Sequence, residues 1–244
     1  MKSTELKKMT AKELLEKYAK GERDFKNVDL SHEDLSGANL KGIDLSLAVL
    51  YKANLKDTNL SDAQLNAALI NGADLQNANL SNANLKKAAF DGSNLKNAKL
   101  TNSNLVYATF YKANLSDADL ENTDLRGANF TDANLQNANL NNANLKDSNF
   151  EGANLKNASL KKANLRNADL TYGVDVIKHE LIPVNLEGAD LTGAKFRYAR
   201  LSGTNFKDAV INQTNFKDAV LKDVKMDKIQ RKIMNLYNRK RLKA

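Results

Sequence analysis

Residues 113–147 read ANLSD ADLEN TDLRG ANFTD ANLQN ANLNN ANLKD, seven successive units of five residues. The third residue of each unit is Leu or Phe, the first is Ala or Thr, and Asn or Asp lies between them. An extended strand points alternate side chains to opposite sides, so the large and small residues face inward and the Asn or Asp faces outward. The same rhythm runs from Phe25 to Leu170. A repeat at a fixed period indicates a solenoid.

The position two residues after each large residue predicts a sharp turn. Between residues 37 and 167 this position is Gly, Asn or Asp in 20 of 27 units, the residue types that best tolerate a positive φ angle. Four buried rings are spaced by twenty residues, which is four units: Phe90, Phe110, Phe130 and Phe150. Four turns per coil predict an all-β, four-sided solenoid in which residues twenty apart lie in columns, about 4.8 Å from one coil to the next.

Units such as ANLKN, ANLSN, ADLEN and ANLQN resemble those of the pentapeptide-repeat family, over roughly residues 25–226. The resemblance implies a right-handed quadrilateral β-helix, with the handedness taken from the family. The opening ELLEKYAKGERDF is similar to the N-terminal segment of several bacterial, often cyanobacterial, members. Family functions rest on binding. One group protects DNA gyrase by mimicking duplex DNA, another regulates cell differentiation through protein contacts, and some members are secreted effectors.

The chain is expected to have three parts: an N-terminal capping helix in residues 1–24, the solenoid in 25–226, and a C-terminal basic helix or tail in 227–244. Thr10 and Glu13 form a capping-box pattern. The stripe of this helix that should be buried comprises Leu14, Leu15 and Tyr18. A solenoid exposes its core and its strand edges at both ends, so we interpret both helices as end caps.

The five-residue register breaks once, in segment 171–185. After Leu170 we place the next large residues at Val176 and Leu181, so that one residue is inserted near Tyr172 and the segment forms a bulged coil or a small protruding loop. On this count Phe196 and Phe216 form a second column.

No catalytic, cofactor-binding or metal-binding constellation is expected. The chain has no Cys, which excludes disulfides and thiolate ligands. The two histidines, His32 and His179, fall far apart along the solenoid. The segment at 171–185 adds only Asp175 and Glu180 to His179, too few groups for a placed acid, base and nucleophile or for a metal site. We therefore predict a protein that is not an enzyme.

The net charge of +8 is concentrated at the C-terminal end. Residues 25–221 hold 21 Lys and Arg against 22 Asp and Glu, whereas residues 222–244 hold nine against two. Mimicry of DNA needs a strongly negative surface, so the neutral body disfavours the gyrase-protecting pattern. A gyrase-modulating or nucleic-acid-associated protein stays open as the alternative. Without a signal peptide or a run of about 18 apolar residues, we expect a cytoplasmic protein with no membrane partner.

One stripe breaks the polar surface pattern and is our candidate contact site. The residue before each large residue is nearly always Asn or Asp, but four units that lie twenty residues apart have another residue there. In the same four coils, the turn position that precedes each of these units is not Gly, Asn or Asp either. The side chains expected in or beside this stripe are Leu47, Val49, Tyr51, Leu69, Val106, Tyr107 and Tyr111. A contiguous exposed apolar surface indicates docking of a protein partner or of a second copy in a homodimer. The alternative is a different turn type that tucks these side chains away.

Two basic features are further candidates. A column suited to contact phosphate, or simply to stay solvated, consists of Lys86, Arg126, Lys146 and Arg166. The tail residues suited to bind nucleic acid or an acidic partner, or to form a frayed end, are Arg239, Lys240 and Arg241. Taken together, the sequence predicts a non-enzymatic scaffold or regulatory module that acts through protein–protein contacts.

Overall fold

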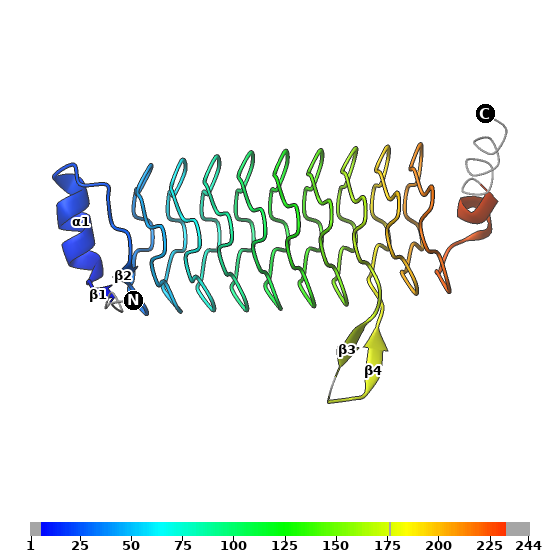
Figure 1. The fold of residues 1–244 in the computed structure, drawn as a ribbon, viewed down its shortest axis with the longest axis horizontal. Coiled ribbons are helices and arrows are strands. Elements are labelled where there is room, and N and C mark those ends of the chain that lie inside the picture. Colours follow the sequence, from blue (N-terminus) through cyan, green and yellow to red (C-terminus); the bar gives the residue numbers. More distant parts are fainter. Residues whose placement is uncertain (1–5, 176, 233–244) are drawn as a thin grey trace, which may run out of the picture.

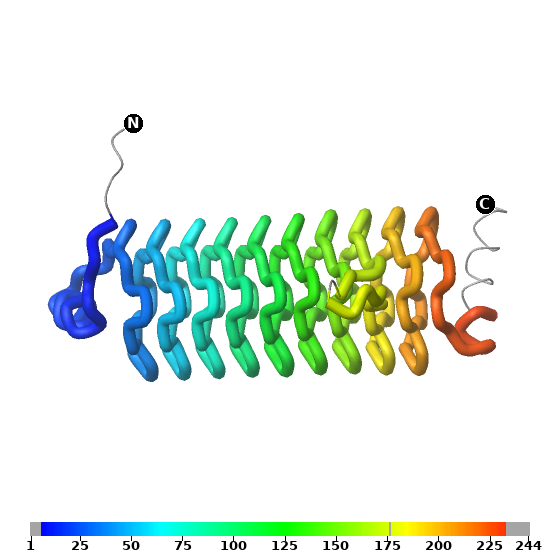
Figure 2. Tube along the Cα trace, turned by 90° about the horizontal axis from the view of Figure 1, so that it is seen from below, coloured from blue at the N-terminus to red at the C-terminus, as the bar shows by residue number. Residues whose placement is uncertain are grey.

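The computed structural model describes residues 6–175 and 177–232, which form an elongated rod of stacked coils (Figure 1). The earliest coils lie at one end of the rod and the latest at the other, and a view turned by a quarter shows the same stacking (Figure 2). Because each coil advances by one strand spacing, about 4.8 Å, residues that are distant along the chain become close neighbours along the rod.

Parallel bridges join each outward residue to the residue twenty positions later. Asn94 bridges to Asn114, and Asn114 bridges to Asn134. The Leu115 amide donates to the Asn134 carbonyl at 2.7 Å, and the Asn134 amide donates to the Ala113 carbonyl at 2.9 Å. The twenty-residue coil is confirmed. We label the four faces A, B, C and D after the inward residues Phe110, Leu115, Leu120 and Leu125.

The turn position has a left-handed backbone whichever residue occupies it. The φ angle is 60° at Asp117, and it is also 61° at Leu47 and 60° at Tyr107. In the turns that follow core residues 30–165 and 186–216, the amide three residues after the large residue donates back to its carbonyl, as Ala118 does to Leu115 at 3.2 Å. The hypothesis of a different turn type at the corner of Leu47 and Tyr107 is therefore wrong.

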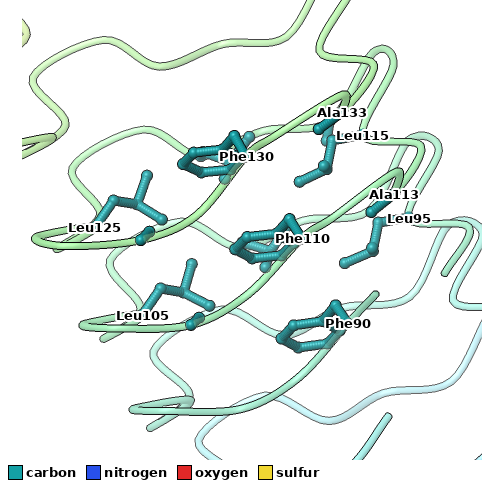
Figure 3. Packing of buried hydrophobic residues seen from close by; sticks show 14 of the residues in the cluster. Phe90, Leu95, Leu105, Phe110, Ala113, Leu115, Leu125, Phe130 and Ala133 are labelled. Carbon is teal, nitrogen blue, oxygen red and sulfur yellow. The ribbon is translucent and has the colours of Figure 1, made fainter. Parts of the chain in front are cut away.

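The interior consists of columns of large side chains separated by small ones. Four fully buried rings on face A stack with centroid separations of 5.0, 4.9 and 4.8 Å: Phe90, Phe110, Phe130 and Phe150. Figure 3 shows the first three rings one above another, with Leu105 and Leu125 on one side and Leu95 and Leu115 on the other. Phe196 and Phe216 stack at 5.2 Å, which confirms the second column. Each fully buried Leu or Phe contributes about 1.5–3 kcal/mol.

The break after Leu170 is eleven residues long, not one. Asn154 bridges to Asn185, a separation of 31 residues where every earlier coil has 20. The additional residues form a hairpin that projects from the rod between faces A and B (Figure 1). Its strands are β3 (Gly173–Asp175) and β4 (Glu180–Ile182), which pair antiparallel.

The prediction that Leu181 is a core residue is wrong, because its side chain is 62% exposed on the hairpin. Between residues 38 and 168 the position two residues before each core residue is Ala, Ser, Thr or, once, Ile43, whereas before Leu181 it is His179. A coil has no room for both, so the segment is extruded. Val176, the other predicted core position, lies outside the described residues. The inward pattern resumes with Val184 and Leu186, which are both fully buried.

The N-terminal end of the rod is covered by a strand and a helix. β1 (Lys7–Lys8) pairs in parallel with β2 (Val28–Asp29) and so covers an open edge of the first coil. α1 (Ala11–Ala19) follows, and its capping box is confirmed: Thr10 Oγ1 accepts from the Glu13 amide, and the Glu13 carboxylate accepts from the Thr10 amide.

One residue of this helix was assigned to the wrong side. Leu14 is fully buried and Tyr18 Oη donates to the Lys41 carbonyl at 2.8 Å, but Leu15 is 38% exposed. Consecutive residues of a helix point about 100° apart, so a helix that meets the coil along one narrow side cannot bury both leucines.

The C-terminal end is closed by a polar side chain. Residues 228–232 are helical. Gln230 is buried and its Nε2 donates to the carbonyls of Phe206 at 2.6 Å and Ala209 at 2.8 Å, groups that would otherwise face the open end of the core. The predicted basic tail of Arg239, Lys240 and Arg241 lies outside the described residues. Within 6–175 and 177–232, no helix is long and apolar enough to cross a membrane.

Candidate interaction surface

Amide side chains cover faces B, C and D with hydrogen bonds that run from coil to coil. On face B the Nδ2 group of Asn114 donates to Asn94 Oδ1, and Asn134 donates to Asn114 in turn, both at 3.2 Å. The same donation occurs on face C from Asn139 to Asp119 at 2.9 Å and on face D from Asn164 to Asn144 at 3.2 Å. Outward polar groups on these faces thereby satisfy one another.

Face A has no such amide chain over four successive coils. Val49, Leu69, Ala89 and Thr109 bridge to one another at the outward positions there. Leu69 is 46% exposed, Val49 is half-buried, and the Thr109 hydroxyl is buried with no hydrogen-bond partner among the described residues. The sequence-predicted apolar stripe therefore faces outward along about 14 Å of the rod.

The corners on either side of face A widen this stripe. Leu47 and Tyr107 lie at the corner between faces D and A and are 50% and 60% exposed. Tyr51 and Tyr111 lie at the corner between faces A and B and are 43% and 41% exposed. We call the resulting surface the apolar patch and define it as Leu47, Val49, Tyr51, Leu69, Ala89, Tyr107, Thr109 and Tyr111.

One predicted member does not belong to the apolar patch. Val106 is buried, with an exposed fraction of 8%. It lies in the corner column between Lys86 and Arg126, one coil away from each. Its short branched side chain stays close to the backbone, while long basic side chains can lay their aliphatic stems over such a neighbour.

Two tyrosines of the apolar patch are held by their neighbours. The Tyr107 ring lies against Gly127, where an added Cβ would come within 2.5 Å of Tyr107 Cδ1. The Lys112 ammonium group lies over the Tyr111 ring, 4.9 Å from its centroid. This interaction with the Tyr111 side chain raises the pKa of Lys112 above its ordinary value. Rings fixed in this way lose little conformational entropy when a partner binds.

The rim of the apolar patch is basic. The corner positions beside it carry four lysines and one aspartate: Lys52, Lys86, Lys87, Lys112 and Asp91. All four lysines are exposed, and none forms an ion pair with a described residue. Asp91 is engaged, since its Oδ1 accepts from the Tyr111 amide at 2.9 Å. The rim therefore favours a negatively charged partner surface.

A cavity of about 380 Å³ lies between the hairpin and the corner of faces A and B. Its lining includes Tyr111, Lys112, Asp132 and Asp175. Backbone amides donate to the Asp175 carboxylate and lower its pKa. The amide of Lys178 has the largest effect. The lining contains no His, Ser or Thr, and its remaining side chains are apolar.

The histidines do not build a metal site in the part of the chain that the structure describes. His32 and His179 are both exposed. Within residues 6–175 and 177–232, no three side chains of His, Asp or Glu lie close enough together to hold a metal ion.

The five-residue pattern also matches known proteins. Family profiles described as pentapeptide repeats match residues 29–63, 58–97 and 185–223, and one described as a pentapeptide repeat region matches residues 93–170. The crystal structure of HetL, from the cyanobacterium Nostoc sp. strain PCC 7120, is 30% identical, with 89% of this chain and 94% of HetL covered and a TM-score of 0.57. This chain belongs to the pentapeptide-repeat family.

HetL is described as a pentapeptide-repeat protein involved in the regulation of heterocyst differentiation. Another similar structure is QnrB1, a plasmid-mediated fluoroquinolone resistance protein, at 17% identity over 88% of this chain and 94% of QnrB1, with a TM-score of 0.33. A thylakoid-lumen protein of Arabidopsis thaliana is 31% identical over 46% of this chain and 68% of its own, with a TM-score of 0.22. No curated protein sequence matches. The fold is the pentapeptide-repeat fold, a right-handed β-helix.

In this pentapeptide-repeat chain, the basic column continues beyond the residues predicted from the sequence. Lys86 is separated from the rest of the column by Val106. Beyond it, consecutive coils at the corner of faces D and A carry Arg126, Lys146, Arg166, Arg197 and Lys217. Arg197 and Lys217 were missed because the insertion was counted as one residue, which put every later coil in the wrong column. The signal that could have placed them was the lack of Ala, Ser or Thr two residues before Val176 and Leu181, where the sequence has Val174 and His179.

Proposed function

We propose that this pentapeptide-repeat protein is a non-enzymatic module that binds a protein partner through the apolar patch. The similarity to HetL, a regulatory protein, over 89% of the chain supports this proposal. The observation that carries it is the replacement of the outward amide chain by Val49, Leu69, Ala89 and Thr109 in four successive coils of one face. These residues do not contribute to the core, so their apolar character has no role within the coil itself.

The partner is a different protein with an acidic rim, not a second copy. Two-fold self-association would place the same lysine-rich rim on both sides of the contact. Lys52, Lys87 and Lys112 would then meet like charges across the interface, which opposes association. A partner with apolar side chains at its centre and Asp or Glu at its edge matches both parts of the surface. Tyrosines such as Tyr107 and Tyr111 are typical anchors of such contacts.

A photo-reactive residue tests where the partner binds. p-Benzoylphenylalanine is placed at Tyr111 in the apolar patch or at Lys99, an exposed outward position on the opposite face C, and each protein is irradiated in the cells that express it. We expect an adduct with one acidic protein from position 111 and none from position 99. An adduct with a second copy of this chain would overturn the assignment to a different protein.

Purified components then give the energetic test. Leu69→Asp should weaken binding of the crosslinked partner at least tenfold, because it buries a charge at the centre of the contact. Val210→Asp is the matched control, since Val210 is 40% exposed at an outward position of face C. Far-ultraviolet circular dichroism checks that both variants keep the solenoid. Equal affinities of the two variants would contradict the proposal.

DNA-directed activity is the competing function, and the same variants address it. The nearly equal numbers of acidic and basic residues in 25–221 do not resemble the negative surface of duplex DNA. We expect no change in gyrase supercoiling, with or without a quinolone, at micromolar protein. If the protein protects gyrase from the quinolone and Leu69→Asp abolishes this protection, the apolar patch would instead be the site of that DNA-directed function.

A further inference from the structure

A row of basic side chains runs along the corner between faces D and A, in the coils that follow the apolar patch. We call it the basic ladder and define it as Arg126, Lys146, Arg166, Arg197 and Lys217. Backbone hydrogen bonds tie these positions together, including Gly127 amide to Lys146 carbonyl at 2.9 Å and Asn167 amide to Arg197 carbonyl at 3.1 Å. Five positions at one strand spacing cover about 19 Å.

Local carboxylates neutralise only part of the basic ladder. Arg126 pairs with Asp124 at 2.7 Å, Lys146 with Asp147 at 3.3 Å and Arg197 with Asp218 at 3.3 Å: three of the five ladder positions. Arg166 and Lys217 form no ion pair within residues 6–175 and 177–232. Exposed pairs of this kind are worth little, so an incoming carboxylate can replace them at low cost.

The basic ladder and the apolar patch meet without a gap. Tyr107 is the last patch residue on this corner, and its ring lies on Gly127, the residue after Arg126. A single extended segment can therefore contact the apolar patch and continue along the basic ladder. We propose that the basic ladder binds an acidic segment of the same protein partner whose apolar segment occupies the patch. This inference rests on the proposed function.

The surroundings of Tyr198 favour a peptide over a nucleic acid. Single-stranded nucleic acids bind by stacking bases on exposed aromatic rings beside basic groups. Tyr198 lies on this corner, and two ladder guanidinium groups already lie over its ring: Arg197 at 4.5 Å and Arg166 at 5.4 Å from its centroid. Carboxylate side chains need no stacking platform and bind guanidinium groups directly.

Two labelled probes test the inference in the full chain: a peptide of ten glutamates and a twenty-residue oligothymidylate, each measured by fluorescence anisotropy. We expect the glutamate peptide to bind, with an affinity that falls as salt is raised. The double variant Arg166→Gln, Lys217→Gln should weaken it about fivefold. The matched control is Lys56→Gln, Lys96→Gln, which removes the same charge from two exposed lysines at the diagonally opposite corner and should change the affinity less than twofold.

Carbodiimide crosslinking locates the bound peptide independently of affinity. Adducts should form at Lys146 and Lys217 and not at Lys56 or Lys96. Equal weakening by both double variants, or adducts confined to the C-terminal lysines, would overturn the inference. Tighter binding of the oligothymidylate with the same dependence on Arg166 and Lys217 would assign the basic ladder to nucleic acid instead.

The two proposals can fail separately. The glutamate peptide carries no apolar side chain, so Leu69→Asp should not change its affinity by more than about twofold. Suppose that Leu69→Asp loses partner binding, while the double variant Arg166→Gln, Lys217→Gln binds the glutamate peptide with unchanged affinity. This result would support the proposed function and refute the basic ladder. The reverse pattern would keep the ladder and refute the apolar patch.

Discussion

Faces A and B of the same coils share their backbone, their turns and their kind of core, yet their outer surfaces differ. On face B, Asn114 receives and passes on amide hydrogen bonds between coils. On face A, the adjoining positions are Leu69, Ala89 and Thr109, which offer no such chain. The difference teaches that inward and turn positions determine the fold, whereas outward positions can change their chemistry without disturbing it. Function in this protein therefore has to be sought at outward positions and corners.

The inward layer should respond in the same way on both faces, with the largest effects. Phe110→Ala on face A should lower the free energy of unfolding by about 3–5 kcal/mol and Leu115→Ala on face B by about 2–5 kcal/mol, because each leaves a cavity between packed coils. Urea denaturation measures both losses. Asn114→Ser, one residue away and outward, should cost well under 2 kcal/mol. Equal losses at Leu115 and Asn114 would break the division into inward and outward positions.

Exchanging the outward residue types of the two faces should lower the free energy of unfolding on face B but hardly change it on face A. Asn114→Leu should lower the free energy of unfolding by about 1–2 kcal/mol, because it removes the donor to Asn94 and the acceptor for Asn134. The reciprocal change Leu69→Asn has no amide neighbour to lose and should be nearly neutral. Thermal and urea denaturation of the pair gives the comparison. A neutral Asn114→Leu would show that the amide chain does not stabilise face B.

The unpartnered hydroxyl on face A provides a change in the opposite direction. Thr109→Val should raise the free energy of unfolding by about 1 kcal/mol, because Thr109 Oγ1 is buried with no partner among the described residues. Thr123→Val is the control of identical shape. It should lower stability by about 1 kcal/mol, since Thr123 Oγ1 donates to the Leu120 carbonyl at 2.7 Å. The same sign for both would refute this account.

The smallest effect concerns the strained corner of the apolar patch. Leu47 has a φ angle of 61°, a conformation that costs a branched residue more than Asn. Leu47→Asn should therefore raise the free energy of unfolding by about 0.5–1 kcal/mol while weakening partner binding severalfold. Ala67→Asn, one coil along at a φ of 53°, should give a similar stabilisation with little change in binding. Lower stability of Leu47→Asn would show that the leucine is retained for the fold.

Most of the apolar patch was predictable from the sequence, and its exceptions have physical causes. Leu47, Leu69 and Tyr107 interrupt a pattern that otherwise repeats, so the exposed stripe follows from counting residues. Val106 was assigned to the same stripe but is buried. The exposed fraction of Val106 depends on the conformations of the long side chains in the adjacent coils. Counting positions in the sequence does not predict those conformations. The alternative of a second turn type could be rejected only from the φ angles of the structure.

By itself, the sequence determined the coil, the turns and the phenylalanine columns, because each depends on residues that recur at one spacing, and it determined the N-terminal cap through the local capping box of Thr10 and Glu13. Only the tertiary structure decided the fate of residues 171–183. A large apolar residue such as Leu181 joins the core only if the residues beside it also fit inside the coil, and His179 does not. Extruding eleven additional residues, which include β3 and β4, shifted the register of every later coil by eleven residues. That shift brought Arg197 and Lys217 into line with Arg126 and so built the basic ladder.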